Sequence, residues 1–307
     1  MDLDVLKMQG LSFFEITERI SLVQGDGRGR NPYCSALLIR DEVTALIDSG
    51  LGHGPLRALL AAVHIDVLFN SHSHPDHIGG NWIAAEQGCR IVVPEQSFAT
   101  IGSAERLALR FMGPERAAEW IEQYVPLTGY RDFQPDASFC DGQVLDFGRT
   151  RLTAIHAPGH LSDHYCFYEP NLSLLVSSDI DLSPYGPWYG NRESDLNLFR
   201  ESLALVTDLE PAVIAPSHAR PVRGLHVAKR LNAYAAALDE RERLIASLLP
   251  DEPFTAEQLA RLTPISGPLA LSDSLIFEWE TEMVRKHLDE MVRAGGLACT
   301  GPLYSLN

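Results

Sequence analysis

The chain has 307 residues and carries 25 basic and 41 acidic side chains, so its net charge at pH 7 is −16. This acidic balance disfavours binding to nucleic acid or to an anionic membrane surface. Hydrophobic residues make up 45% of the chain and charged residues 21%, as in a soluble globular protein. No run of 18 apolar residues predicts a transmembrane helix.

The chain begins with the acidic residues MDLDV at 1–5, which lack the basic and apolar pattern of an export signal. Five cysteines are scattered along the sequence and never occur in CxxC spacing, which is consistent with reduced thiols packed as small hydrophobic residues. We therefore expect a cytoplasmic protein that does not bind a membrane.

The first third of the chain alternates between strand and helix patterns. Apolar and β-branched runs predict strands and apolar repeats of helical period predict helices. The predicted strands are 13–24, 33–47 with a turn at Asp41-Glu42, 65–69 and 89–93, and the predicted helices are 55–63 and 78–87. This order predicts a mixed sheet that is covered by helices.

Directly after the strand at 65–69 comes NSHSHPDHIGG, in which three histidines and a carboxylate fall within six residues: His72, His74, Asp76 and His77. Lone histidines are usually surface or hydrogen-bonded core residues, but four metal-binding side chains at this spacing favour a metal site. His72 and His74 can point to the same side of an extended loop. Asp76 and His77 follow the turn at Pro75, so each pair can hold its own metal.

Residues 97–139 have a different character, with two helical patterns at 104–112 and 114–124 and no cluster of metal-binding residues. We interpret this stretch as a helical insertion. It either covers a site or adds packing to the scaffold, and the sequence favours neither interpretation.

Strands resume at 143–147 and 151–157, and three more metal-binding side chains follow predicted strands. The turn Pro158-Gly159 presents His160, the hairpin 165–177 ends before Asp179, and the strand 212–215 ends before His218. Helix 195–209 connects the last two strands. Loops at one edge of a sheet converge, so we expect these residues to meet His72–His77.

Together, the motif HxHxDH at 72–77, the Pro-Gly-His turn at 158–160, Asp179, His218 and the early loop Ile47-Asp48-Ser49-Gly50 resemble the metallo-β-lactamase-fold hydrolase superfamily over roughly residues 13–225. The resemblance implies an α/β fold, an αββα sandwich, with a binuclear metal centre. It implies that one metal binds His72, His74 and His160, that the other binds Asp76, His77 and His218, and that Asp179 bridges them.

The chain departs from the family pattern at two loops. Ser178 stands before the bridging carboxylate, and Ser217 and Ala219 flank the last histidine, where relatives often have glycine. Asp181 is a weaker alternative to Asp179 as the bridge. His164 could contact a metal ligand or the substrate, and a structural hydrogen bond is the simpler interpretation.

The ligand set of nitrogen and oxygen atoms favours two zinc ions, and iron and manganese remain alternatives. The resemblance implies that a water molecule bridging the metals is activated as hydroxide and cleaves a small ester, thioester or lactone. Asp76 is the residue to which we assign a catalytic role beside metal binding. Tyr185, Trp188 and Tyr189 could form an apolar wall for the substrate, or they could pack beneath the insertion.

We divide the chain into a catalytic domain at 1–225 and a C-terminal domain at 226–307. The latter has helix patterns at 223–249, from Thr255, and at 275–294, then a hairpin at 295–306, which resembles a winged helix. Residues 251–307 hold four basic and nine acidic residues, so binding to nucleic acid is not expected. Contact within a homodimer or covering of the active site is favoured instead.

Two alternatives to the small-molecule hydrolase remain open. One is a phosphodiesterase or endoribonuclease of the same superfamily, against which the acidic balance argues. The other is a ligand-binding regulator without activity on a degenerate fold, against which the seven metal-binding residues argue.

Overall fold

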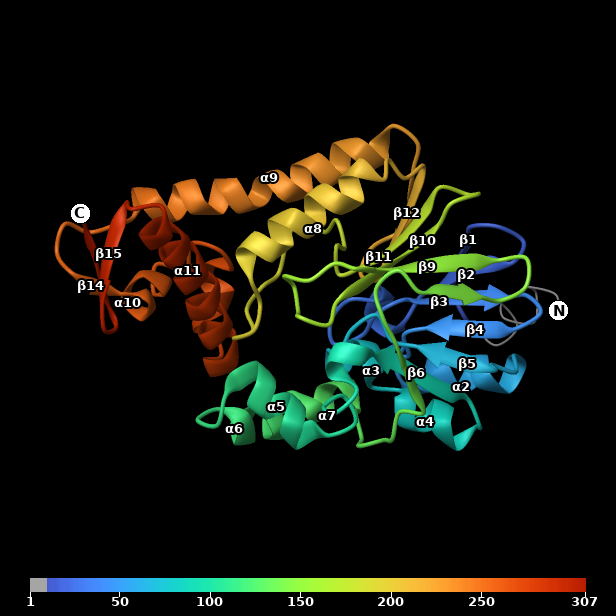
Figure 1. Cartoon of the computed structure of the whole chain (residues 1–307). Coiled ribbons are helices and arrows are strands. Elements are labelled where there is room, and N and C mark those ends of the chain that lie inside the picture. Colours follow the sequence, from blue (N-terminus) through green and yellow to red (C-terminus); the bar gives the residue numbers. More distant parts are fainter. Residues whose placement is uncertain (1–9) are drawn as a thin grey trace.

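A computed structural model describes residues 10–307 and shows two facing sheets with helices on their outer sides (Figure 1). The N-terminal residues 1–5, on which the expectation of no export signal depends, lie outside the described range. No helix within 10–307 combines the length and the apolar character needed to cross a membrane.

The first sheet has seven strands in the order of the chain. They are β1 (Phe13–Glu15), β2 (Ile20–Val23), β3 (Ala36–Arg40), β4 (Thr44–Ile47), β5 (Val67–Phe69), β6 (Arg90–Pro94) and β7 (Ala137–Phe139). The strands β1 to β4 are antiparallel, and β4 to β7 are parallel. Helices α2 (His53–Ala62), α3 (Pro75–Ile78) and α4 (Asn81–Glu86) connect the parallel strands.

The second sheet has the order β13-β12-β11-β10-β9-β8. Its strands are β8 (Val144–Asp146), β9 (Arg151–His156), β10 (Tyr165–Glu169), β11 (Leu174–Ser178), β12 (Val213–Pro216) and β13 (Val222–Arg223). Helix α8 (Leu196–Asp208) joins β11 to β12, which are parallel.

Three apolar layers hold the sandwich together. Side chains of both sheets, such as Leu37 and Phe167, form the layer between them. The outer face of the first sheet packs on α2 and α4, for example through Leu59, and the outer face of the second packs on α8 through Phe199. This alternation of helix, sheet, sheet and helix confirms the predicted αββα architecture.

Two sequence predictions were wrong in detail. Residues 13–24 form two strands rather than one, because the Thr17 hydroxyl accepts hydrogen bonds from the backbone N–H groups of Arg19 and Ile20 and closes a turn. The helices α5 (Ala104–Met112), α6 (Ala117–Gln123) and α7 (Val125–Thr128) occupy the predicted insertion. Its last residues, however, form β7, which pairs with β6 in the first sheet.

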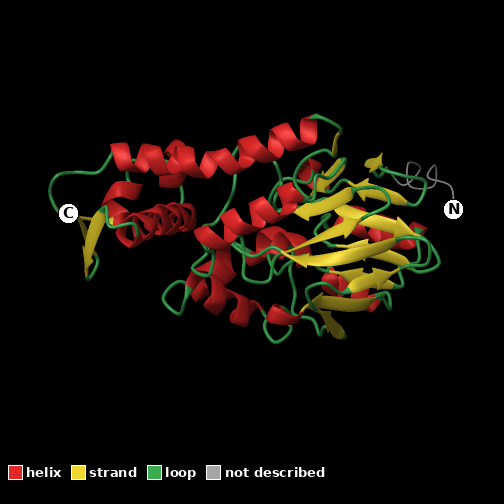
Figure 2. Ribbon diagram, turned by 45° about the horizontal axis from the view of Figure 1, so that its top comes forward, coloured by secondary structure: helices red, strands yellow, loops and turns green. Residues whose placement is uncertain are grey.

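The C-terminal segment lies at the end of the molecule opposite the N-terminal strands, and α9 (His226–Ser247) runs from the sandwich toward it (Figure 2). It contains β14 (Phe254–Thr255), α10 (Ala256–Ala260), the 3₁₀ turn Gly267–Leu271, α11 (Ser274–Arg293), β15 (Leu297–Thr300) and β16 (Leu303–Leu306). The strands pair in the order β14-β16-β15, and this segment has its own small core. Thr255 caps α10, as predicted. The winged-helix assignment and the domain boundary at 225/226 stay predictions.

Candidate metal centre

The histidine-rich loop follows β5 and ends in a short helix. Pro75 begins α3, which places Asp76 and His77 on its first turn, while His74 precedes it in extended conformation. The loop after β4 packs closely against this helix, because a Cβ atom on Gly50 would lie 1.4 Å from the Asp76 carbonyl oxygen. Glycine at position 50 is therefore required for the two loops to meet.

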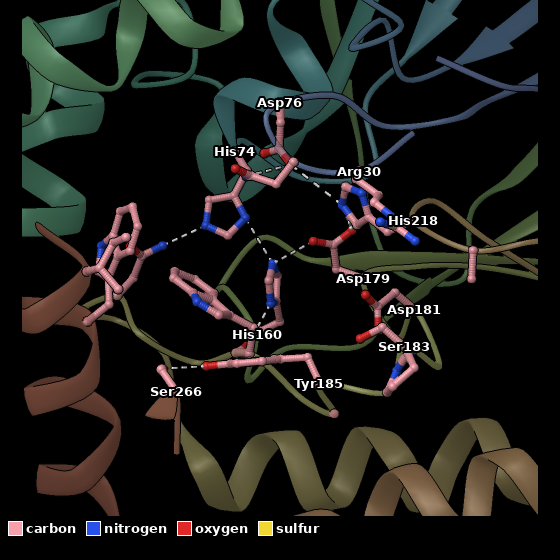
Figure 3. Close-up of a pocket in the computed structure, with 18 of the residues that line it drawn as sticks. Arg30, His74, Asp76, His160, Asp179, Asp181, Ser183, Tyr185, His218 and Ser266 are labelled. Carbon is pink, nitrogen blue, oxygen red and sulfur yellow. Dashed lines mark hydrogen bonds and ion pairs between the residues drawn. The ribbon is translucent and has the colours of Figure 1, made fainter. Parts of the chain in front are cut away.

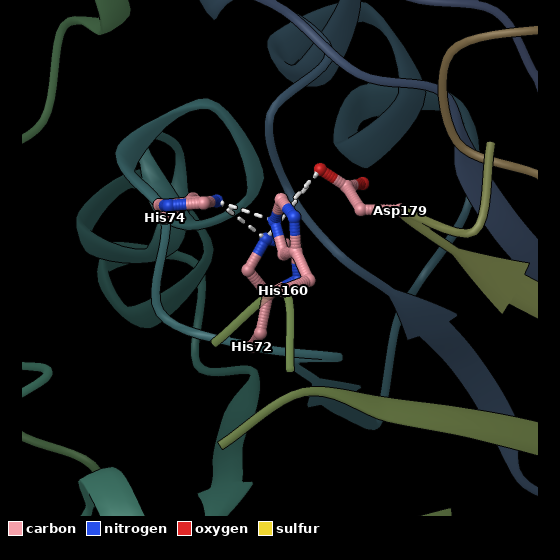
Figure 4. Close-up of side chains that lie close together, drawn as sticks. All are labelled: His72, His74, His160 and Asp179. Atoms are coloured by element: carbon pink, nitrogen blue, oxygen red, sulfur yellow. Dashed lines mark hydrogen bonds and ion pairs between the residues drawn. The ribbon is translucent and has the colours of Figure 1, made fainter. Parts of the chain in front are cut away.

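Three imidazoles converge in a first cluster (Figure 4). The Nδ1 atom of His74 lies 3.0 Å from Nε2 of His72 and 2.9 Å from Nε2 of His160. The Oδ2 atom of Asp179 completes the group at 3.2 Å from His160 Nε2. Ligands of a tetrahedral zinc ion, at about 2.0–2.1 Å from the metal, are separated by roughly 3.4 Å. The first cluster therefore fits a divalent cation.

A second cluster lies next to the first. The Nε2 atoms of His77 and His218 are 3.3 Å apart, and Asp76 Oδ2 lies 3.5 Å from His218 Nε2. The Oδ1 atom of Asp179 lies 3.0 Å from His77 Nε2 and 3.4 Å from His218 Nε2. These four residues offer a second set of nitrogen and oxygen donors that fits a divalent cation.

Asp179 is shared, with one carboxylate oxygen directed at each cluster. Its Oδ1 atom is buried and has no hydrogen-bond partner among the described residues. Burial raises the pKa of this carboxyl, but His77, His218 and His72 outweigh burial and hold the pKa well below its usual range. The preceding Ser178 has a φ of +48°, the left-handed conformation that favours glycine.

The ring nitrogens that face away from the clusters are held by hydrogen bonds. Such bonds fix the orientation of a ligand and the nitrogen that it offers to a metal. His77 Nδ1–H donates to Asp48 at 2.8 Å, His218 Nδ1–H to the Gly29 carbonyl at 2.7 Å, and His160 Nδ1–H to the Trp188 carbonyl at 2.8 Å. The Asn191 amide bonds to His74 Nε2 at 2.6 Å, and Ser71 Oγ lies 3.0 Å from His72 Nδ1.

The electrostatics of the two clusters differ. Burial lowers the pKa of His72 and His74 well below the usual value, so both rings are neutral and can offer a lone pair. Burial also disfavours charge on His77 and His218, but Asp179 outweighs it and raises the pKa of both, that of His218 to about 9. The second cluster thus strongly attracts positive charge.

Two predicted residues lie elsewhere. Asp181, the alternative bridge, belongs to neither cluster, and its carboxylate accepts the Ser183 N–H at 2.9 Å. His164 is fully buried and does not line the cavity. It donates from Nδ1 to the Ala157 carbonyl and accepts the Asp179 backbone N–H at 3.2 Å, so it supports the bridging residue rather than a substrate.

Both clusters open into a cavity of about 690 Å³ (Figure 3). Tyr185 and Trp188 line it, whereas Tyr189 is fully buried and hydrogen-bonds through its hydroxyl to His287. Side chains from the insertion and from the C-terminal segment also line the cavity: Phe111, Trp120, Tyr124, Leu269, Ile276, Trp279 and Met283. The insertion and the C-terminal segment therefore both cover the site.

Several residues near the two clusters had no signal in the sequence. Asn31 donates to Asp76 Oδ2 at 3.3 Å and to the Tyr124 hydroxyl at 2.7 Å. The backbone carbonyl of Asn191 accepts a hydrogen bond from Lys286 of α11 at 2.8 Å. A single asparagine in a loop carries no spacing signal, so only the tertiary structure identifies these contacts.

Comparisons with known proteins agree with this arrangement. The family model described as the metallo-beta-lactamase superfamily matches residues 29–218. A lactamase-like protein of Arthroderma otae is 28% identical over 145 residues, which are 46% of this chain and 40% of that protein. A hydroxyacylglutathione hydrolase of Francisella tularensis subsp. tularensis is 30% identical over 84 residues, 27% of this chain and 33% of that protein. The matches thus span well under half of these curated relatives.

Solved structures resemble the whole chain more closely in fold than in sequence. A metallo-beta-lactamase family protein from Thermus thermophilus superposes with a TM-score of 0.75 at 23% identity, over 95% of this chain and 100% of that chain. A beta-lactamase domain protein from Burkholderia ambifaria gives a TM-score of 0.68 at 20% identity, over 96% and 94%. At these identities the likeness shows the fold alone.

Proposed function

The chain belongs to the metallo-beta-lactamase superfamily, and we propose on this premise that it is a hydrolase with two divalent metal ions, preferably zinc, that cleaves a carboxylic ester, thioester or lactone. One observation carries the proposal. Asp179 directs one carboxylate oxygen to each of two donor clusters, and its Oδ1 atom is buried without a hydrogen-bond partner among the described residues.

The side chains of the two clusters would bind one metal ion each. His72, His74 and His160 would hold one metal, Asp76, His77 and His218 the other, and Asp179 both. When bound, the metals would supply Lewis acidity and lower the pKa of a water molecule from about 16 toward 7. The surrounding hydrogen bonds keep each ligand aimed at its cluster, so little reorganisation is needed during the reaction.

Asp76 has a position suited to proton transfer. It lines the cavity, and its Oδ2 atom accepts a bond from Asn31 at 3.3 Å. From there the carboxylate can orient the attacking water molecule and accept its proton, then return that proton to the leaving group. Tyr124 lines the same wall and can donate a hydrogen bond to the substrate.

The cavity supports an acyl substrate. Aromatic and aliphatic side chains of α6 and α11 surround the opening above the clusters, an environment that favours an apolar group. The curated relative from Francisella tularensis carries the name of a thioester hydrolase, hydroxyacylglutathione hydrolase, which supports this bond type for the present chain.

A panel of thioesters, lactones, aryl esters and phosphodiesters, including RNA, tests the proposal on wild-type protein and Asp76→Asn. Acyl hydrolysis is expected, with a loss of kcat/KM well above tenfold in the variant. Asp146→Asn is the matched control, since Asp146 lies on the surface beside Arg151 and its replacement should leave activity unchanged. Cleavage of RNA without any acyl hydrolysis would contradict the proposal and support a phosphodiesterase.

A further inference from the structure

The cavity has two chemically different ends, and the difference identifies a class of substrate. We propose, resting on the hydrolase function above, that the substrate is an amphipathic acyl ester or thioester. Its acyl group would be apolar and lie between α6 and α11, and its other portion would carry an anionic group bound by Arg28, Arg30 and Arg220.

The apolar end is built by the insertion and the C-terminal segment together. The rings of Trp188 and Trp279 have centroids 5.8 Å apart, and those of Tyr124 and Trp279 are 5.7 Å apart, so the aromatic wall continues from the metal ligands to α11. Leu269 lines the cavity although it is 62% exposed. An acyl chain that reaches this leucine would cover exposed apolar surface.

The cationic end is built by two loops that meet at His218. Arg28 and Arg30 flank Gly29, whose carbonyl accepts the hydrogen bond from His218, and Arg220 follows His218 by two residues. All three arginines line the cavity and are exposed. Their guanidinium groups can therefore approach an anionic group of a bound substrate.

These three arginines have no carboxylate partner among the described residues, although the protein is acidic. The chain has 41 acidic residues, yet no carboxylate among residues 10–307 forms an ion pair with Arg28, Arg30 or Arg220 within 4.0 Å. Arg110, by contrast, is paired with Asp163 at 2.9 Å. The Arg220 guanidinium lies over the Phe14 ring, 5.6 Å from its centroid. Guanidinium groups without a carboxylate partner in a binding cavity favour a carboxylate or phosphate ligand.

The metal ligands lie between the two ends. Figure 3 shows Arg30 beside His218, with Tyr185 and Ser266 on the opposite side of His160. The scissile carbonyl group would thus sit over the clusters. Water would add to the acyl carbon, and the bond from that carbon to sulfur or oxygen would break. The proton of the water molecule would pass to the departing sulfur or oxygen atom, which belongs to the portion that carries the anionic group.

A matched set of thioesters tests the inference. The thiol is 3-mercaptopropionate or its neutral methyl ester, the acyl group is acetyl, hexanoyl or decanoyl, and the released thiol is measured. We expect kcat/KM to rise up to about fourfold per added methylene until the apolar end is filled, and to be about tenfold higher for the anionic thiol than for its neutral ester.

Because two of the three arginines are removed, the variant Arg28→Gln/Arg30→Gln should lose most of the preference for the anionic thioester, measured as the ratio of kcat/KM for the anionic over the neutral substrate. Leu269→Ser should reduce the advantage of decanoyl over hexanoyl only. Arg151→Gln, which changes a surface arginine away from the cavity, is the control. Equal rates on anionic and neutral thioesters in wild type, or an anionic preference kept in the double variant, would overturn the inference while leaving the hydrolase intact.

Absence of turnover on every acyl substrate would instead contradict the hydrolase function. In that case the inference is tested separately, by calorimetric measurement of the binding affinities of the non-cleavable decyl thioethers of the two thiols. Tighter binding of the anionic thioether, lost in the double variant, supports the two-ended cavity, and equal binding of both overturns it.

Discussion

Asp48 follows β4 and holds the loop after β5 that carries His77, and Asp48→Asn tests how far it controls the metal. The carboxylate accepts three hydrogen bonds: from the Ser71 backbone N–H at 2.8 Å, from Ser71 Oγ at 2.7 Å and from His77 Nδ1 at 2.8 Å. Asparagine has the same shape and tolerates the φ of +65° found here. It replaces one accepting oxygen by a donor and removes the negative charge. With the amide oxygen at the position of Oδ2, the Ser71 backbone N–H loses its acceptor, and the bond from His77 Nδ1–H is kept but is no longer charge-assisted.

The expected effect falls mainly on one metal. Mutation of such a partner of a ligand typically lowers metal affinity by about 10- to 100-fold, equivalent to about 1.4–2.7 kcal/mol. The metal at His77 is affected more, because Asp48 contacts His77 directly and reaches His72 only through Ser71 Oγ. Competition with a chromophoric chelator should therefore show one binding constant weakened clearly more than the other, with Asp146→Asn as the control.

Two outcomes would refute this reasoning. Unchanged affinity at both sites would show that Asp48 does not orient His77. Equal weakening at both sites would show that the variant disturbs the whole loop, and then the two clusters would not be independent.

Three further predictions concern stability and substrate contact. Burial lowers the pKa of His287 to about 3, so below about pH 6.5 the unfolded state binds a proton that the folded state does not. The free energy of unfolding should therefore fall by up to about 1.4 kcal/mol per pH unit from pH 6.5 toward pH 3. In urea unfolding of chelator-treated protein, His287→Phe should show a shallower dependence of this free energy on pH. Arg110→Met leaves the buried Asp163 unpaired and should cost about 3–5 kcal/mol of unfolding free energy. Arg261→Met, at an exposed ion pair, should cost under about 1 kcal/mol, and equal losses in the two variants would contradict this prediction. Tyr124→Phe removes a hydroxyl from the cavity wall and should lower kcat/KM roughly threefold to tenfold with metal content unchanged, and loss of metal instead would assign the hydroxyl a structural role.

The fold and the members of the two clusters could be predicted from the sequence, because the patterns that indicate them are short motifs or recur after successive strands. Four metal-binding residues within 72–77 are a strong pattern, and His160, Asp179 and His218 each follow a strand that ends at the same edge. Strand and helix order predicted a mixed sheet covered by helices, and the resemblance to the superfamily implied the sandwich. The turn at Thr17 and the strand β7 depend on contacts that no periodicity marks.

The residues around the two clusters could not be predicted in the same way. Tyr189 and His164 stand next to ligand loops in sequence, but both side chains point into the protein interior. Asn191 and Arg30 lie in loops without any motif, and only the packing of distant segments brings them to the site. Adjacency in sequence therefore predicts the members of the two clusters better than the groups that hold them or line the cavity.

The number of metal ions bound per chain tests the central claim most directly. Protein purified without chelators, then analysed by inductively coupled plasma mass spectrometry, should contain two equivalents of divalent metal per chain. Asp179→Ala, which removes the carboxylate shared by both clusters, should reduce the content at both sites. Less than one equivalent in the wild-type protein, after incubation with zinc as well as before it, would contradict a two-metal hydrolase.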